Sequence, residues 1–235
     1  MAARLRPEQN PAYRFPLFSI IYFVLNIIKE QTMKNIITIG REYGSGGRTI
    51  GKKVAELLGY DYYDRELIDE AAKESGLSAE FIEKTEQSLT GSFLYNLAMG
   101  NSYSYGMLSP TGSNVLPLTM QVFLAQQEAV LKFAEKPCVI VGRCADYILR
   151  DRDDVLKIFV YSTDEKRIER AVKEYSLEPK KAREQLIRSD KSRARHYSTF
   201  TDWDWADRSH YDIMLNSGVI GIDAAAEFIA TIAKK

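Results

Sequence analysis

The chain has 235 residues, of which 45% are hydrophobic and 27% are charged, and its 32 Lys and Arg balance its 32 Asp and Glu. This composition is typical of a globular protein and excludes a disordered, fibrous or many-pass membrane protein. The chain is long enough to bury a core without metal or disulfide support. A net charge of zero argues against a dedicated nucleic-acid binder.

The first 32 residues differ from the rest of the chain. An apolar run at 15–28 follows Arg4, Arg6 and Arg14, a pattern found in membrane anchors and signal peptides. A helix that crosses a bilayer needs about 20 apolar residues, so this run is too short. No small-residue cleavage site follows it. We therefore predict an accessory extension over 1–32, with membrane contact through 15–28 as the lesser alternative.

The cysteines and histidines predict neither a disulfide framework nor a metal site. Cys138 and Cys144 lie in or beside an apolar run, without a CxxC or Cys/His cluster, which favours a reducing, cytoplasmic location. His196 and His210 are too isolated to predict metal ligands.

From residue 33 onward, short apolar runs alternate with helical patterns. The runs predict strands at 36–39, 61–63, 138–141, 155–161 and 211–215, and the helical spacing predicts helices at 49–58, 66–74, 78–87, 118–134, 163–175, 179–197 and 223–233. This alternation predicts an α/β fold of three layers, a parallel sheet flanked by helices on both faces. The segment 88–117 is rich in Gly, Ser, Asn and Tyr and predicts a long loop or an inserted lobe.

A glycine-rich loop stands between the first predicted strand and the first predicted helix. Its central residues are Gly44, Ser45, Gly46, Gly47, Arg48 and Thr49. Glycines let the backbone turn its N–H groups inward, and the helix N-terminus adds partial positive charge, so the loop predicts a phosphate cradle. A glycine-rich turn that binds no ligand is the alternative.

The loop departs from the standard motif GxxxxGK[ST]. If Gly46 is the last motif glycine, Gly47 stands in the place of the lysine. If Gly47 is the last motif glycine, Arg48 replaces the lysine and Thr49 takes the hydroxyl position. We favour the second register because it keeps a cation near the phosphates, but the sequence leaves both open.

A second candidate site follows the apolar strand at 138–141, where the sequence reads Gly142-Arg143-Cys144-Ala145-Asp146. Ligands of open parallel sheets bind at the carboxyl ends of strands, so Arg143 is placed to hold a phosphate with two parallel hydrogen bonds. An ion pair between Arg143 and a surface carboxylate is the alternative.

Four segments together resemble the cytidylate kinase-like branch of the nucleoside monophosphate kinases. They are ITIGREYGSGGRTIGKKVAELLGYDYYDRELI, CVIVGRCADYIL, RSDKSRARHY and YDIMLNS. The resemblance implies a P-loop kinase-like fold over 33–235, with an acceptor-binding lobe at about 65–134 and a helical lid at about 179–200. It also implies phosphoryl transfer from ATP to a nucleoside monophosphate, CMP or dCMP first, with Mg²⁺ placed in part by Thr49.

The resemblance assigns roles to residues outside the loop. Arg143 would hold the acceptor nucleotide, although Asp146 lies two positions later than the aspartate of the family's Gly-Arg-Asp. Asp64 would face the acceptor or, through water, magnesium. Where cytidylate kinases have a Tyr-Arg pair that contacts the acceptor, this chain has Asp69-Glu70, which favours a kinase for another small acceptor as one alternative.

The predicted helix at 179–197 is strongly basic. Residues 180–195 contain seven Lys and Arg but only two Asp and Glu. A phosphoryl-transfer site needs such cations to neutralise the charge of the transferring group. Its Asp-x-x-Arg resembles the family's lid, which points to Asp190 and Arg193 as catalytic residues, with Arg188 and Arg195 beside them. A solvated basic helix is the alternative. A regulatory nucleotide-binding protein without catalysis is the alternative from another class, favoured by the missing lysine.

Aromatic residues gather after the basic helix. For Trp203, Trp205, Tyr197 and Tyr211 we expect packing of a loop onto the core rather than stacking on a nucleobase.

Overall fold

A computed structural model describes residues 33–64 and 118–234 continuously, together with residues 67, 70, 73, 74 and 76. The predicted extension at 1–32 and most of the predicted acceptor lobe, including the segment 88–117, lie outside the described residues. Nothing in the structure therefore tests these two predictions.

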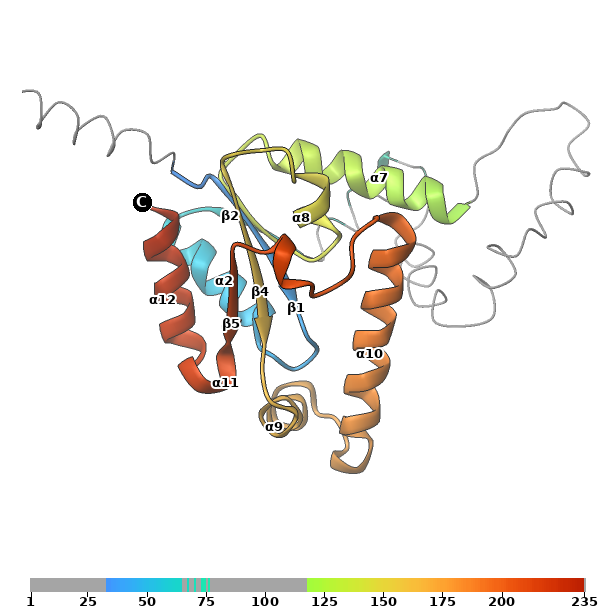
Figure 1. Cartoon of the computed structure of the whole chain (residues 1–235), viewed down its shortest axis with the longest axis vertical. Helices are drawn as coiled ribbons and strands as arrows, with labels where there is room; N and C mark the ends of the chain where they lie inside the picture. The colour runs from blue at the N-terminus through green and yellow to red at the C-terminus, as the bar shows by residue number, and fades with distance from the viewer. Residues whose placement is uncertain are drawn as a thin grey trace, which may run out of the picture.

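Parallel strands form a single five-stranded sheet in the described part of the chain, in the spatial order β2-β3-β1-β4-β5 (Figure 1). The strands are β1 (Ile36–Arg41), β2 (Asp61–Tyr63), β3 (Cys138–Val141), β4 (Val155–Tyr161) and β5 (Ile213–Asn216). The helices are α2 (Gly47–Leu58), α7 (Leu118–Phe133), α8 (Ala145–Ile148), α9 (Asp164–Tyr175), α10 (Pro179–Phe200), the 3-10 helix η3 (Arg208–His210), α11 (Ser217–Ile220) and α12 (Ile222–Ala233).

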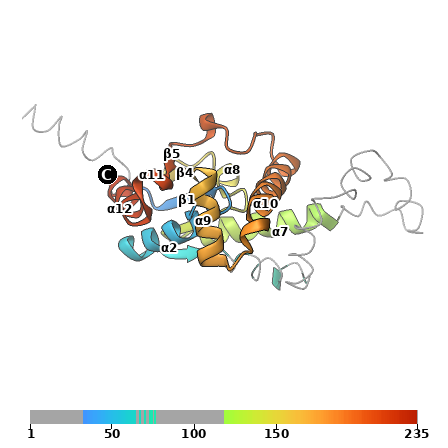
Figure 2. The ribbon, with the colours of Figure 1, turned by 90° about the horizontal axis from the view of Figure 1, so that it is seen from below.

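Alternating side chains of the central strands build a core on each face of the sheet. Ile37 and Ile39 of β1 pack with α2 and α12, whereas Ile36 of β1 packs with α7 and α8 on the other face. This alternation follows from the two-residue period of a strand. Figure 2 shows α2 and α12 on one side of the sheet and α7 and α10 on the other. The predicted three-layer α/β architecture is thus confirmed.

The strand order creates a switch point beside β1. From β1 the chain continues to β2, which lies on one side of β1 beyond β3. From β3 the chain continues to β4, which lies on the other side of β1. In open parallel sheets, ligands bind outside the carboxyl ends of the strands at such a point. The loops after β1 and β3 both begin there.

Within the described residues, the predicted elements agree with the observed ones except at their ends and in short segments. The predicted helix at 78–87 and most of the one at 66–74 lie outside the described residues. Helix α2 begins at Gly47, two residues before the predicted start, and the last strand begins at Ile213 rather than at Tyr211. The four-residue helices α8 and α11 were not predicted, because so short a helix has no periodic hydrophobic pattern. Among the described residues, no helix combines the length and the apolar character needed to cross a bilayer.

Candidate active site

The loop after β1 turns through two glycines in the left-handed region. Gly44 has φ +75° and Gly46 has φ +82°. A Cβ atom at position 44 would lie 2.7 Å from the backbone oxygen of Arg167. Both the backbone angle and the lack of space therefore require glycine at position 44.

Side chains of α9 and α11 donate hydrogen bonds to the carbonyl groups of this loop. Arg167 Nε donates to the oxygen of Tyr43 at 2.8 Å, Arg170 Nη1 donates to that of Gly44 at 2.8 Å, and Ser217 Oγ donates to that of Ser45 at 2.5 Å. In a trans peptide, the next N–H group points away from the carbonyl. The N–H groups of Gly44 and Gly46 therefore point away from these donors.

The start of α2 adds further donors to the loop. Its N-cap, Gly46, has no side chain that could accept a hydrogen bond from the first turn. The first N–H groups of a helix lack partners within the helix, and the helix dipole favours an anion beside them. The loop and the first turn of α2 thus both present backbone N–H donors, as the predicted phosphate cradle requires.

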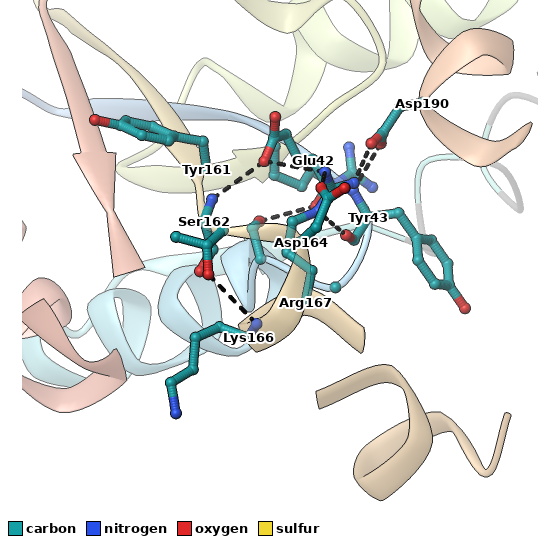
Figure 3. Close-up of polar contacts among 12 residues, drawn as sticks. Glu42, Tyr43, Tyr161, Ser162, Asp164, Lys166, Arg167 and Asp190 are labelled. Carbon is teal, nitrogen blue, oxygen red and sulfur yellow. Dashed lines mark hydrogen bonds and ion pairs between the residues drawn. The ribbon is translucent and has the colours of Figure 1, made fainter. Parts of the chain in front are cut away.

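A buried ion-pair cluster ties this loop to helices α9 and α10 (Figure 3). Arg167 of α9 pairs with Asp190 of α10 and also lies 3.5 Å from Glu42 and 3.4 Å from Asp164. Asp190 Oδ1 accepts a hydrogen bond from the N–H of Tyr43 at 2.7 Å. Asp190, expected to be a catalytic residue, therefore links α10, the predicted lid helix, to the loop in this structure.

A cavity of about 510 Å³ opens between the carboxyl ends of β1 and β3 and helix α10. Arginines reach it from three places: Arg41 from β1, Arg143 from the turn after β3, and Arg188 and Arg193 from α10. Among the described residues that line the cavity, Asp146 alone carries a carboxylate. The excess of guanidinium groups makes the cavity suited to an anionic ligand.

The turn after β3 holds Arg143 in a strained conformation. Gly142, Arg143 and Cys144 have consecutive positive φ values of +80°, +61° and +53°. A left-handed conformation costs about 1–2 kcal/mol for a residue with a side chain. Such strain gathers at functional sites, where the surrounding structure enforces it. Here it brings the guanidinium of Arg143 to the cavity.

The arginines of the cavity repel one another. Burial lowers the pKa of Arg41, and the nearby Arg143 adds to this effect, while Asp64 opposes it. Burial and the neighbouring Arg41 lower the pKa of Arg193 to about 9. A bound anion would relieve this repulsion, which is a property of phosphate sites.

Asp146 lines the cavity and bonds to two tyrosines. The hydroxyl of Tyr197 donates to Asp146 Oδ2 at 2.7 Å, and the side chain of Tyr211 also bonds to this carboxylate. Burial raises the pKa of Asp146, against the opposite effect of these hydrogen bonds. The carboxylate also raises the pKa values of both tyrosines beyond what their burial does.

The shifted pKa of Asp146 predicts a pH-dependent stability. Its folded-state pKa lies above the ordinary value, so the folded protein binds more protons than the unfolded chain as the pH rises above about 3.8. We expect the free energy of unfolding of the wild type, measured relative to that of Asp146→Asn, to fall as the pH rises from about 3.8 through the raised pKa of Asp146. Urea denaturation of both proteins at a series of pH values measures the difference. A difference that rises with pH would contradict the assigned shift.

Other residues predicted for the site lie outside the large cavity. Arg48 pairs with the buried Asp64, and the Arg48 side chain is 61% exposed. Arg195 lines a smaller cavity of about 330 Å³, which Lys191 and Arg188 also line. Thr49 is half-buried in the first turn of α2.

The aromatic residues after α10 pack onto the fold, as expected. Trp203 and Trp205 lie against the buried Phe123, Cys144 and Tyr197. Trp205 and Tyr211 also line the large cavity, as does Tyr197 within α10.

Sequence reasoning missed Arg41 as a site residue. It also missed Arg167 and Arg170, which hold the loop from α9. The signal for Arg41 was present, because it is a cation two residues after the predicted strand at 36–39, at the start of the glycine-rich loop. For the other two, α9 gave no sign of which loop it would contact.

Comparison with known proteins identifies the family of the chain. Residues 36–219 match the model of the cytidylate kinase-like family. A cytidylate kinase of Pyrococcus horikoshii is 27% identical over 200 residues, which cover 82% of this chain and 88% of that protein. A cytidylate kinase of Thermoplasma acidophilum is 22% identical over 195 residues, covering 83% and 89%. A solved structure of an uncharacterized protein from Eubacterium ventriosum is 26% identical, with a TM-score of 0.62, over 84% of this chain and 97% of that one. The chain belongs to the cytidylate kinase-like family.

Proposed function

We propose that this protein transfers the γ-phosphate of ATP to a nucleoside monophosphate, with CMP or dCMP as the first candidate. One observation carries the proposal: a cavity with four arginines opens directly beside a glycine-loop anion cradle. Two phosphate sites next to each other are what a donor and a phosphorylated acceptor require. The family and the two cytidylate kinases support the nucleotide as the acceptor class.

The reaction needs positioning and charge neutralisation more than proton transfer. An oxygen of the acceptor phosphate forms a bond to the γ-phosphorus, while the bond from that phosphorus to the β–γ bridging oxygen breaks and ADP leaves with the electron pair. The cradle between Gly44 and Thr49 would hold the donor phosphates. Arg143 would hold the acceptor phosphate, and Arg188 and Arg193 would neutralise charge on the transferring group. No general base is required when the acceptor is already an ionised phosphate.

Magnesium fits this site only together with the nucleotide. Within the described residues, no cluster of three or more His, Cys, Asp or Glu could hold a metal ion. Mg²⁺ commonly binds through one or two protein oxygens plus substrate phosphates. In the second register of the loop, the Thr49 hydroxyl is the protein oxygen that we propose for it, and the bound ion would neutralise charge on the phosphates.

A kinase for a different small phosphorylated acceptor is the second candidate. Glu70 stands in the segment where cytidylate kinases have their Tyr-Arg pair, and the Glu70 carboxylate accepts a hydrogen bond from Lys132 at 2.9 Å. Lys132 also bonds Glu74 at 2.7 Å. A carboxylate at this position cannot replace the arginine that binds the acceptor in cytidylate kinases. This favours a different mode of acceptor recognition.

The decisive measurement is ADP production from Mg-ATP by the full chain with a panel of acceptors. We expect turnover with CMP or dCMP above that with UMP, AMP and GMP. Turnover with another acceptor alone would support the second candidate. Thermal stabilisation by ATP without turnover on any acceptor would contradict both and would favour a regulatory nucleotide-binding protein.

A further inference from the structure

The two registers of the phosphate loop place different residues at the position of the motif lysine. In the standard motif, that lysine reaches the β- and γ-phosphates. Arg48, the candidate of the second register, extends to Asp64 with its side chain 61% exposed and is not among the residues that line the large cavity. The first register places Gly47 there, which has no side chain at all.

The space beside Gly47 is filled by Arg41. A Cβ atom at position 47 would lie 2.6 Å from the Cβ of Arg41 and 3.1 Å from its Cγ. At the far end of the same side chain, a Cβ atom on Gly142 would overlap Nη1 of Arg41. The Arg41 side chain therefore runs from the first residue of α2 to the turn that carries Arg143. Both glycines leave the space in which it lies.

The guanidinium of Arg41 lies beside Gly142, in the turn that carries Arg143. Arg41 lines the large cavity, and its side chain is 21% exposed. Its nearest carboxylate, Asp64, lies 3.6 Å away and also pairs with Arg48. Arg193 Nη1 donates to the backbone oxygen of Arg41 at 3.0 Å, so the lid helix contacts the same residue. One carboxylate shared between two arginines leaves positive charge for a ligand.

We propose that Arg41 supplies the cation of this phosphate loop, in the place of the missing lysine, and binds the phosphate that is transferred. The proposal rests on the proposed kinase function, and it assigns the loop to the first register. In that register Arg48 stands at the hydroxyl position, so Thr49 would not be the motif's ligand for Mg²⁺. Arg48, in contrast, would act through Asp64, as a positioning residue. Position 47 would remain glycine because Arg41 occupies the direction that a lysine would take.

Moving the cation from position 41 to position 47 tests this inference. We expect Arg41→Ala to lower kcat by about 100-fold, in the range found when one donor to a developing charge is removed. Gly47→Lys alone is also expected to be impaired, because its side chain meets Arg41. The double variant Arg41→Ala/Gly47→Lys should regain at least about tenfold of the kcat lost in Arg41→Ala. A purely structural role of Arg41 would give no such recovery.

Matched variants separate the outcomes. Lys52→Ala removes an exposed cation on α2, the helix that begins at Gly47, and should retain wild-type kcat. Arg41→Gln keeps most of the side-chain volume and replaces Arg41→Ala if the latter does not fold, as judged by circular dichroism. Wild-type kcat in Arg41→Gln, or a larger loss in Arg48→Ala than in Arg41→Ala, would overturn the inference.

A binding measurement keeps this test independent of turnover. If the wild type phosphorylates no acceptor, the proposed function fails, and the affinity for tripolyphosphate still tests Arg41. We then expect Arg41→Ala to bind tripolyphosphate at least about tenfold more weakly than the wild type in titration calorimetry. Equal affinities would overturn the inference on Arg41 whether or not the protein is a kinase.

Discussion

Arg143→Ala is expected to lower kcat/KM for the acceptor by about 100-fold to 1000-fold, measured as ADP production at saturating Mg-ATP. The turn after β3 brings this guanidinium to the cavity at the expense of a left-handed backbone. A planar guanidinium can donate two parallel hydrogen bonds to a phosphate, which an ammonium group cannot do. Arg143→Lys should therefore recover only part of the lost activity.

Backbone strain provides a second readout at the same position. Because Arg143 has φ +61°, glycine should be tolerated there better than alanine by about 1 kcal/mol in urea denaturation. Arg143→Gly is thus expected to be folded at least as stably as Arg143→Ala, and equally inactive. Arg150→Ala serves as the control, because Arg150 is exposed and lies outside the cavity lining. An Arg143→Gly variant with wild-type kcat/KM would show that this arginine does not bind the acceptor.

The sequence predicted the strands and Arg143 for a common physical reason. Apolar runs such as Cys138–Val141 are the strands of a buried parallel sheet. The carboxyl ends of such strands share one edge, so a cation placed after each strand predicts a shared site. Arg143 from β3 and Arg193 from the basic helix do line one cavity.

Side-chain direction and long-range pairing could not be predicted in the same way. Arg41 and Arg48 both flank the loop, but only the folded backbone shows that Arg41 crosses Gly47 while Arg48 turns to Asp64. Asp190 was expected to be a catalytic residue from its local Asp-x-x-Arg pattern. Its ion pair with Arg167 depends on the packing of α9 against α10, for which one sequence contains no signal.

Removal of Arg167 is expected to destabilise the fold by about 3 kcal/mol in urea denaturation. The Arg167 side chain is 7% exposed, and Asp190 is 17% exposed. Arg167→Met would leave Asp190 and Glu42 without this cation and the carbonyl of Tyr43 without its donor. Asp190 would keep Arg193 at 3.5 Å and Glu42 the N–H of Ser162 at 3.1 Å, but both would lose the most buried cation of the cluster. The loss of one partner of a buried ion pair costs more than the pair itself contributes. Lys166→Ala, next to it on α9, removes a surface ion pair with Glu169 and should cost less than about 0.5 kcal/mol.

A double-variant cycle shows whether this ion pair holds the loop or only the helices. Arg167→Met/Asp190→Asn removes both charges, so it should be less destabilised than the sum of the two single variants, with an interaction energy of about 1–3 kcal/mol. Both partners also bond to the backbone of Tyr43, through its carbonyl and its N–H. The double variant should therefore still bind ATP more weakly than the wild type after its stability has partly recovered. The carbonyl of Tyr43 has lost its Arg167 donor, and the N–H of Tyr43 can bond only an uncharged amide oxygen in place of the carboxylate. Wild-type ATP affinity in the double variant would show that the loop keeps its shape without α9 and α10.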